Sequence, residues 1–386
     1  MADPAPAKVY ASSVDRMSAA HPDVKIAAQS VQNDPYKTKL QVAMGAGQPP
    51  DVWYSFGGGG VLKQYVDAGE VMDLTSILGA APFQDRFAPA SAFGNMTFDG
   101  KIYAVPTVIS GAFFFYDKQL FEKLGVKPWN TWDEFLAALQ TLKSGGVVPL
   151  ALANKGKWAG AFYYNYLVGR IAGFDFLPRV LSGAASFNSP EVVQAGKLLQ
   201  DLAKLDVFSP GYDGLNYDTG DSRQLLYSGK AGMEMILNFF QGTALAESPD
   251  YAARMGFSPF PTIPGGKDDG SGIIGGVSAA FAISKGSKNP AGAVELINFL
   301  TDNTARDAFA DGKTITALKG ASPTDPLTKD LSNAFGKAKY FQLYWDQYLP
   351  PALGQAQLDV SQALLDMKTT PEAAAEQLAA VAKTAQ

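Results

Sequence analysis

Apolar residues follow two patterns along the chain, one with the spacing of helices and one with the length of strands. In residues 192–205 and 293–300 they recur every three or four positions, so that they would line one face of a helix. Short apolar runs between such segments predict strands at residues 24–28, 51–55, 102–105, 113–116, 147–150, 233–237 and 277–283. Strands that alternate with helices indicate an α/β architecture with buried, largely parallel sheets.

Several helix starts can be read directly from the sequence. Proline is tolerated at the first helical position, where its missing N–H needs no partner, and a short polar residue before it caps the helix. This pairing occurs at Asp34–Pro35, Ser189–Pro190, Ser248–Pro249, Asn289–Pro290 and Thr370–Pro371. Thr131 and Glu134 have the spacing of a capping box, in which each side chain accepts from the backbone N–H of the other. We therefore expect helices to begin at these positions.

Composition limits the possible chemistry. At about 150 residues per domain, the 386 residues predict two or three domains. The chain has no Cys and a single His, which excludes disulfides, thiolate sites and His clusters and disfavours a Ser-His-Asp triad. We expect no metal, no cofactor and no catalytic residue, and His21 is assigned no role. A net charge of 32 − 37 = −5, without a basic stripe, argues against a nucleic-acid partner.

The sequence leaves the cellular compartment open. No apolar run reaches the ~18 residues that a membrane-spanning helix needs. The basic and apolar segments of a signal peptide are also absent from these residues. Met1–Pro4 fits either the start of a cytoplasmic protein or the mature part of a secreted one.

Glycines mark turns at which the backbone can approach a ligand closely. Gly57–Gly60 lies between the predicted strand that ends at Ser55 and a predicted helix, a place where glycines can bind phosphate. No Gly-Lys-Ser/Thr follows, so we favour close approach of the backbone to a neutral ligand. Asp268–Gly270 lacks the acidic spacing of a calcium loop and is interpreted as a solvated turn.

Aromatic residues give the strongest indication of function. The chain has 24 Phe, 16 Tyr and 5 Trp, and they gather at residues 53–56, 158–176, 239–240 and 340–348. A pyranose can stack its C–H face on such rings while Asp, Asn, Gln and Ser beside them bind its hydroxyls. A single aromatic residue is more often part of a core, but clusters beside strand ends favour a carbohydrate site. A glycosidase that uses two of the acidic residues stays an alternative.

Short segments in a fixed order along most of the chain resemble a known family. They include residues 21–26, 34–40, 47–52, 65–69, 100–106, 115–118, 131–135, 229–233, 258–261 and 346–351. In sequence and order these segments are similar to family 1 extracellular solute-binding proteins, the maltose-binding-protein-like receptors of sugar ABC importers. The resemblance implies an α/β, two-lobed, periplasmic-binding-protein-like (type II) fold with a hinge. It assigns residues 1–112 and 277–318 to the N-terminal lobe and 113–276 and 319–386 to the C-terminal lobe.

The same resemblance implies a function without catalysis. The protein would bind a mono- or oligosaccharide in the interlobe cleft and deliver it to the membrane permease of an ABC transporter. It would be a monomer in the periplasm or outside the cell, with a lipid anchor as an alternative. The family has a strand before its first helix, whereas this chain starts almost at that helix. We therefore expect the first strand of the N-terminal lobe to be missing and its slot to be an association site.

Candidate site residues follow from the aromatic clusters and the resemblance together. They are Trp53, Tyr54, Ser55, Phe56, Gly57, Asp117, Trp158, Asn238, Phe239, Gly275, Gly276, Trp345 and Asp346. Trp158, Phe239 or Trp345 would stack on the sugar, and Asp117, Asn238 and Asp346 would bind hydroxyls. Phe239 stands where the family often has Trp, and Asp117 where it commonly has Asn. A receptor for a polyamine or a sugar phosphate stays an alternative.

Overall fold

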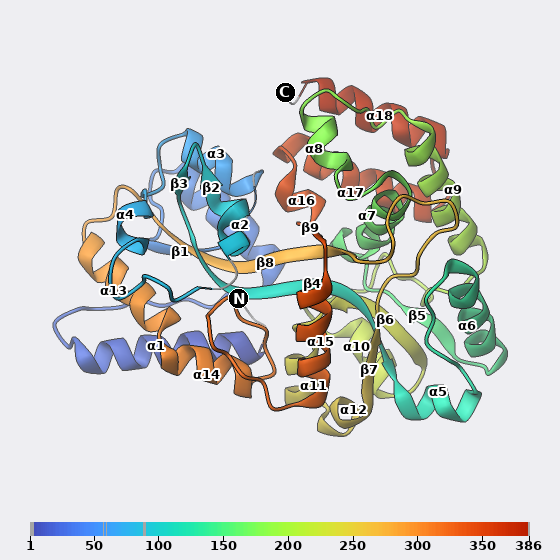
Figure 1. Ribbon diagram of the computed structural model, residues 1–386, viewed down its shortest axis with the longest axis horizontal. Coiled ribbons are helices and arrows are strands. Elements are labelled where there is room, and N and C mark those ends of the chain that lie inside the picture. The colour runs from blue at the N-terminus through green and yellow to red at the C-terminus, as the bar shows by residue number, and fades with distance from the viewer. Residues whose placement is uncertain (1–3, 57, 59, 88–89, 385–386) are drawn as a thin grey trace. The chain divides into compact units, whose positions relative to one another are not determined.

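The chain folds into two compact units. The computed structural model describes residues 4–56, 58, 60–87 and 90–384 (Figure 1). Unit 1 comprises residues 1–110, 239–247 and 276–332, and unit 2 comprises residues 111–238, 248–275 and 333–386. Each unit is thus assembled from three separate stretches of the sequence.

This division differs from the predicted lobes at residues 239–247 and 319–332, which the prediction assigned to the C-terminal lobe. Helix α11 (Phe240–Glu247) packs against α1 (Pro4–Ala20), which belongs to unit 1. Asp325 lies just before α15 (Pro326–Lys337) and accepts a hydrogen bond from Gln241 of α11. It also forms an ion pair with Lys313, whose Nζ lies 2.9 Å from Asp325 Oδ1. These contacts attach both segments to unit 1.

Unit 1 places helices around a small antiparallel sheet. Its helices besides α1 and α11 are α2 (Asn33–Gly45), α3 (Val61–Asp67), α4 (Thr75–Leu78), η1 (Ala90–Met96), α13 (Pro290–Thr301), α14 (Asn303–Asp311) and the start of α15. Its strands are β1 (Val52–Ser55), β2 (Thr97–Phe98), β3 (Lys101–Ile102) and the unit 1 parts of β4 (Val105–Asp117) and β8 (Gly272–Ile283). β1 runs antiparallel to β8, with Val52 opposite Ile283.

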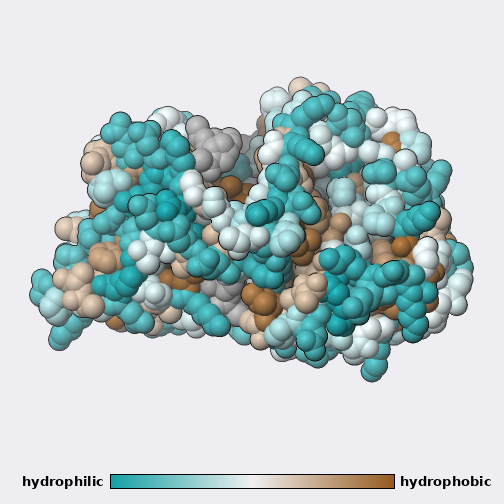
Figure 2. Space-filling model, turned by 60° about the horizontal axis from the view of Figure 1, so that its bottom comes forward, coloured by the Kyte–Doolittle hydropathy of each residue, from teal (hydrophilic) through white to brown (hydrophobic). Residues whose placement is uncertain are grey.

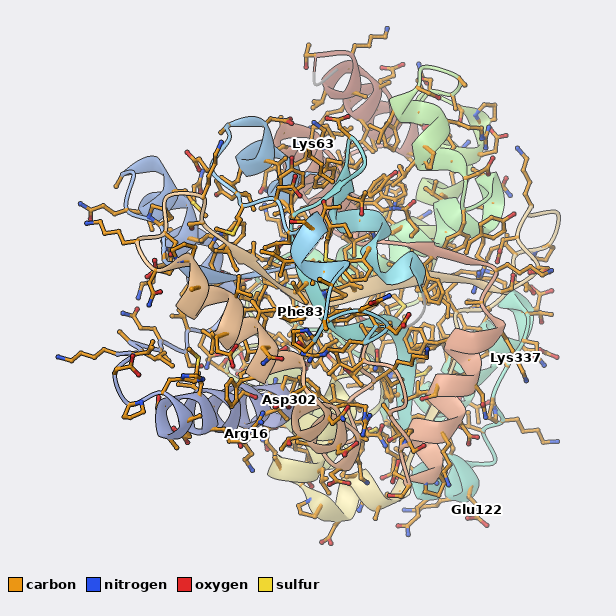
Figure 3. The ribbon with its side chains drawn as sticks, turned by 60° about the vertical axis from the view of Figure 1, so that its left-hand side comes forward. Arg16, Lys63, Phe83, Glu122, Asp302 and Lys337 are labelled. Atoms are coloured by element: carbon orange, nitrogen blue, oxygen red, sulfur yellow. The ribbon has the colours of Figure 1, made fainter. Side chains whose placement is uncertain are left out.

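The core of unit 1 forms on both faces of β1, because successive side chains of a strand point to opposite faces. Trp53 packs with Leu40, Met44 and Leu62, whereas Tyr54 belongs to a second cluster. Helix α1 is tied to the junction of α13 and α14 by Arg16, whose Nη2 donates to Asp302 Oδ1 at 3.1 Å. Figure 3 labels this pair, and the two residues lie next to each other.

Unit 2 is larger and covers its sheet with helices. These are α5 (Lys118–Leu124), α6 (Trp132–Ser144), α7 (Trp158–Ala172), α8 (Phe176–Leu181), α9 (Pro190–Lys204), α10 (Asp221–Tyr227), α12 (Pro249–Arg254), α16 (Trp345–Tyr348), α17 (Pro351–Leu365) and α18 (Pro371–Thr384). Its own strands are β5 (Val148–Ala151), β6 (Ala231–Leu237), β7 (Met255–Ser258) and β9 (Tyr340–Gln342). Helices α7, α9, α17 and α18 pack against one another and form one helical layer.

The sheet of unit 2 is mixed, so the prediction of largely parallel sheets is wrong. β6 pairs with β4 antiparallel and with β5 parallel, and β7 joins β4 antiparallel. β9 runs parallel to β8, with Tyr340 opposite Gly272 and Gln342 opposite Ile274. β4 and β6 are antiparallel although the chain stays in unit 2 between them, whereas it passes through unit 1 at residues 239–247 before it adds β7 to β4.

Most of the predicted helix starts are confirmed. Thr131 and Glu134 form the capping box, with Thr131 N donating to Glu134 Oε2 at 3.0 Å. Ser189 caps α9 and Asn289 caps α13, and in each case proline follows at the first helical position. At α2 the prediction is off by two residues, because the helix begins at Asn33 and Gln32 occupies the cap position.

The predicted strand at residues 24–28 does not form. Residues 25–32 have no regular secondary structure, and most of them are exposed. A strand needs a neighbour for its backbone N–H and C=O groups, and no described strand pairs with this segment. β1 itself pairs with β8, and its Tyr54 carbonyl accepts a hydrogen bond from the Tyr36 hydroxyl of α2.

The described part of the chain contains no helix that combines the length and the apolar character needed to cross a membrane. Figure 2 shows one face of the molecule, on which hydrophilic side chains predominate and hydrophobic ones are scattered.

Candidate ligand-binding site

A small pocket lies within unit 2, and we call it the unit 2 pocket. It is a void with room for about one water molecule, lined by buried residues, and is formed by α7, α8, α16, β8 and β9. Its lining is mostly apolar and aromatic, with two amide side chains. The lining residues are Asn165, Val168, Gly169, Gly173, Phe174, Phe176, Leu177, Ile274, Gln342 and Trp345.

Glycines allow Phe174 to take its place in the pocket wall. A Cβ on Gly169 would lie 2.9 Å from the Phe174 ring, and one on Gly272 would lie 2.3 Å from it. Gly173 ends α7 with a φ of 92°, a conformation that side chains with a Cβ rarely adopt. The ring therefore lies against bare backbone of both α7 and β8.

Arg170 fixes the loop that carries this part of β8. The side chain is buried and pairs with Asp268, while Nη2 donates to Phe260 O at 2.9 Å and Nη1 to Gly272 O at 2.9 Å. Its guanidinium also lies over the Phe174 ring, 5.6 Å from the centroid. A buried charge with this many partners holds its neighbours in one arrangement.

Some polar atoms around the unit 2 pocket have hydrogen-bond partners among the described residues, and some do not. Trp345 is 2% exposed, and its Nε1–H has no hydrogen-bond partner among the described residues. Asn165 Nδ2 donates to Gln357 Oε1 at 3.2 Å, and Gln342 Nε2 donates to Leu343 O at 3.1 Å. Because an unpaired buried N–H is costly, Trp345 is the side chain here with most to gain from a ligand or water acceptor.

Trp158 offers the half-buried ring that a sugar platform requires. It is the first residue of α7, and the rings of Phe162 and Tyr217 contact it nearly edge-on, at centroid distances of 5.7 and 5.3 Å. Lys157, just before it, pairs with Asp359 of α17 at 2.6 Å. The indole is thus supported from two sides while part of it stays accessible.

Trp158 and the pocket lie on the same side of α7. Residues 158, 162, 165 and 169 are spaced by four, three and four positions, so they form one stripe on the helix. At 1.5 Å per residue, Trp158 lies about 10 Å along the helix axis from Asn165. Phe162 lies between them on the helix, and its ring centroid is 5.6 Å from that of Tyr344, the residue before Trp345. The predicted residues Trp158, Trp345 and Asp346 therefore belong to one region of unit 2.

The candidates at the end of β1 have another role. Trp53 and Tyr54 are 3% and 7% exposed, and both are core residues of unit 1. Tyr54 Oη donates to Ser278 O at 2.6 Å, and Ser55 is buried as well. Phe56 is half-buried, with Lys37 Nζ 5.5 Å from its ring centroid. Gly57 lies outside the described residues.

Asp117 and Asn238 make internal hydrogen bonds. Asp117 Oδ1 caps α5 by accepting from the backbone N–H of Gln119, and Oδ2 accepts from Arg254 Nε at 2.6 Å. Asn238 Oδ1 accepts from Gly111 N at 2.8 Å. Both side chains are buried and stabilise the fold of unit 2.

The remaining candidates lie where the chain passes from one unit to the other. Phe239 is a half-buried residue at the start of a unit 1 segment. Gly275 and Gly276 stand on either side of the boundary within β8, and Gly276 has a φ of 148°. The structure therefore distributes the predicted site residues over both units.

Sequence reasoning missed Asn165, Phe174 and Gln342. Asn165 is the only amide in an otherwise apolar stretch of α7, and Gln342 lies within an aromatic run; both are buried. A buried polar residue in such surroundings is a recognisable signal. Phe174 belonged to a predicted aromatic cluster, but its role depends on Gly272, which is distant in sequence.

One carboxyl group with an unusual environment lies outside the pocket. Glu234 of β6 is 1% exposed, and burial raises its pKa to about 7, against the smaller opposing effects of Ser222 and Arg223.

Tyr344, the residue just before α16, also has a shifted pKa. Burial raises the pKa of its hydroxyl well above the ordinary value, so the hydroxyl stays protonated. Over the described residues there is no group of three or more acidic or His side chains that would hold a metal ion.

Comparison with known proteins places the chain in a family. Residues 5–307 match the family model described as bacterial extracellular solute-binding protein. The chain is 25% identical over 313 residues to an uncharacterised ABC transporter extracellular-binding protein of Pyrococcus horikoshii, which covers 79% of this chain and 67% of that protein. This protein belongs to the bacterial extracellular solute-binding protein family.

Solved structures support the fold along almost the whole chain. One, from work on xylan utilization by the thermophilic bacterium Caldanaerobius polysaccharolyticus, is 31% identical with a TM-score of 0.90, and covers 97% of this chain and 95% of that one. A chitin oligosaccharide binding protein is 26% identical with a TM-score of 0.89, and covers 98% and 94%. The predicted two-lobed, periplasmic-binding-protein-like fold is thereby confirmed.

Proposed function

We propose that this protein binds a carbohydrate and delivers it to the membrane permease of an ABC importer, in the periplasm or outside the cell. The observation that carries the proposal is the half-buried Trp158 ring at the start of α7, which Phe162 and Tyr217 support. Two similar structures, one from work on xylan utilization and one of a chitin oligosaccharide binding protein, support the same ligand class.

In this proposal aromatic rings contact the sugar faces and polar side chains bind the sugar hydroxyls. The Trp158 ring stacks on the C–H face of a sugar. Asp346, half-buried beside Trp345, accepts from a sugar hydroxyl. The predicted contacts of Phe56, Phe239, Gly275 and Gly276 belong to the same proposal. Binding and release need no catalytic group.

A thermal-shift panel followed by calorimetric titration tests the function. The panel contains xylose, xylobiose, xylotriose, N-acetylglucosamine, chitobiose, a sugar phosphate and spermidine. A ligand that binds only the folded state stabilises it by about 2.7 kcal/mol at one hundred times its Kd, so a sugar is expected to raise the melting temperature. A shift with spermidine or the phosphate alone contradicts a carbohydrate receptor. Hydrolysis of the oligosaccharides during incubation contradicts a receptor without catalysis.

A further inference from the structure

Two carboxyl groups of unit 2 are hydrogen bonded to each other where a loop meets the end of α17. Asp213 belongs to the 209–220 loop, which contains no helix or strand, and Asp366 directly follows α17. Carboxylates have no hydrogen to donate, so their mutual hydrogen bond requires a proton on one of the two groups. The pair therefore carries a single negative charge while this bond is made.

The neighbours of the two carboxyl groups differ. Asp213 Oδ1 accepts from Gln362 Nε2 at 3.0 Å and from Asn154 Nδ2 at 3.2 Å, which are neutral donors. Asp366 Oδ2 instead accepts from Lys368 Nζ at 2.7 Å. Because a cation favours a negative charge beside it, the charge is expected on Asp366 and the proton on Asp213.

The pKa values of the pair agree with this assignment. Burial raises the pKa of Asp213, and the Asp366 carboxylate beside it raises it further. Burial also raises the pKa of Asp366, but its hydrogen bonds, of which that from Lys368 has the largest effect, together lower it below its ordinary value. Tyr212 donates to Asp366 Oδ1 at 3.0 Å, and burial and both carboxyl groups raise its pKa, so its hydroxyl stays protonated. Between the two Asp pKa values the pair holds one proton.

Asn154 connects Asp213 to the first turn of α7. Its side chain is completely buried, and besides the Nδ2–H that Asp213 accepts, its Oδ1 accepts from Gly160 N at 2.9 Å. Its backbone N–H donates to Tyr212 O at 2.8 Å, and its backbone C=O accepts from Lys157 N at 2.9 Å. Asn154 is thus bonded both to the loop and to α7, so a displacement of the loop reaches the start of the helix.

Trp158, the first residue of α7, is held from the same two directions. Lys157 before it has a φ of 65°, a conformation that a residue with a Cβ adopts only when its surroundings impose it. Helices α7 and α17 pack against each other (Figure 1), and Lys157 Nζ donates to Asp359 of α17 at 2.6 Å, so these two charges neutralise each other. Tyr217 of the 209–220 loop contacts the Trp158 ring. The loop and α17 together therefore fix both the backbone and the ring of Trp158.

We propose that Asp213 and Asp366 are positioning residues for Trp158: the proton that they share attaches the 209–220 loop to α17 and so holds the ring where a sugar can stack on it. This inference rests on the proposed carbohydrate binding. Loss of the proton at higher pH leaves two adjacent carboxylates, which repel each other and loosen the loop. Sugar affinity therefore falls as the pH rises through the range in which Asp213 loses its proton.

Calorimetric titration with xylotriose and with chitobiose from about pH 4, the ordinary pKa of Asp, to about pH 8 tests the proposal. Wild-type affinity is expected to fall about fivefold or more across the range, the usual size of a coupling between two sites. Asp213→Asn puts a permanent N–H donor opposite Asp366 and keeps the Oδ1 acceptor, so its affinity is expected to stay within about twofold of the acidic wild-type value at every pH. Asp366→Asn is expected to behave in the same way and serves if Asp213→Asn does not fold.

Asp201→Asn is the matched control, because it makes the same change of charge on the exposed surface of α9. Glu234→Gln removes the buried carboxyl group whose pKa is about 7. Both variants are expected to keep the wild-type fall in affinity. A wild-type affinity that does not depend on pH, or the same fall in Asp213→Asn, overturns the inference.

Tryptophan fluorescence over the same pH range gives a readout that needs no sugar. The wild-type protein is expected to show a step that is absent from Trp158→Phe, because it comes from that ring, and absent from Asp213→Asn. A step that persists in Asp213→Asn, or no step in the wild type, overturns the inference. If no sugar binds at any pH, the proposed function fails, and the fluorescence step alone decides whether the carboxyl pair positions Trp158.

Discussion

Glu234 shows how a single side chain can set the pH dependence of the whole protein. Every residue of β6 is buried, and Glu234 is the acidic residue among them. Burial raises the pKa of Tyr163 and of Tyr251, and the charge of the nearby Glu234 carboxylate raises both further. Arg223 is the cation near Glu234. Burial in these surroundings raises its pKa to about 7.

We expect stability to fall as the pH rises between about 4.5 and 7. In that range the folded state keeps the Glu234 proton while the unfolded state has lost it, so the folded state is favoured at the acidic end. The full difference, about 2.5 pKa units, is on the order of 3 kcal/mol. Glu234→Gln is expected to flatten this part of the profile and to stabilise the protein above pH 7, measured by urea unfolding at several pH values.

The exposed Glu376→Gln in α18 is the matched control and is expected to keep the wild-type profile. A Glu234→Gln protein whose stability depends on pH as steeply as wild type would show that other groups control this range.

Trp158 gives a second prediction at the scale of one residue. Trp158→Ala removes the half-buried ring but leaves the neighbouring Phe162 and Tyr217 in place. We expect the affinity for the sugar found in the panel to fall about tenfold or more, because stacking and the buried ring area are both lost. Trp158→Phe is expected to retain part of the affinity. Unchanged titration curves for Trp158→Ala would remove this residue from the site.

At the scale of elements, the pocket depends on strands and helices meeting where glycines leave room. Gly272→Ala introduces a Cβ at 2.3 Å from the Phe174 ring. Overpacking of this kind costs about 1–3 kcal/mol, and Phe174 is expected to be displaced, so the melting temperature should fall. Gly286→Ala, where a Cβ meets nothing within 4 Å, is the control. Thermal unfolding of both variants checks the prediction; equal behaviour of the two contradicts it.

Structural features that depend on residues close together in the sequence could be predicted. Features that depend on packing between segments far apart in the sequence could not. The Thr131–Glu134 capping box involves neighbours in the chain and was predicted correctly. Trp53 and Tyr54 looked like ligand contacts because they end a strand, but α2, α3 and β8 bury them. Asp117 was interpreted as a hydroxyl acceptor, although it stands just before a helix and caps it. Trp158, predicted from the aromatic cluster that it begins, stays a predicted ligand contact.

At the scale of the whole molecule, the order of segments determines which part of the chain completes which unit. The last stretch, residues 333–386, contributes α16, α17 and α18 to unit 2. Helix α17 packs on α7 and α9, and α18 packs on α9. The helices that form the pocket wall are therefore supported by the end of the chain.

Removal of residues 351–386 is expected to unfold unit 2. The truncation takes away the buried apolar residues of α17 and α18, among them Leu353, Val360, Leu364 and Leu378. At about 1.5–3 kcal/mol for each fully buried side chain, the loss is comparable to the stability of a typical domain. Circular dichroism and limited proteolysis should show loss of helix and rapid cleavage within unit 2. A truncated protein that keeps a cooperative transition and resists the protease would contradict the prediction.

The three-stretch construction of unit 2 also has a consequence for the timing of folding. During synthesis, β4 to β6 emerge before α17 and α18, the helices that pack on α7 and α9. Contacts between such distant segments form slowly, because a long loop must close before they stabilise anything. The faces of α7 and α9 that α17 and α18 cover therefore stay exposed until residues 351–384 have been made, so the helical layer of unit 2 is completed only after them.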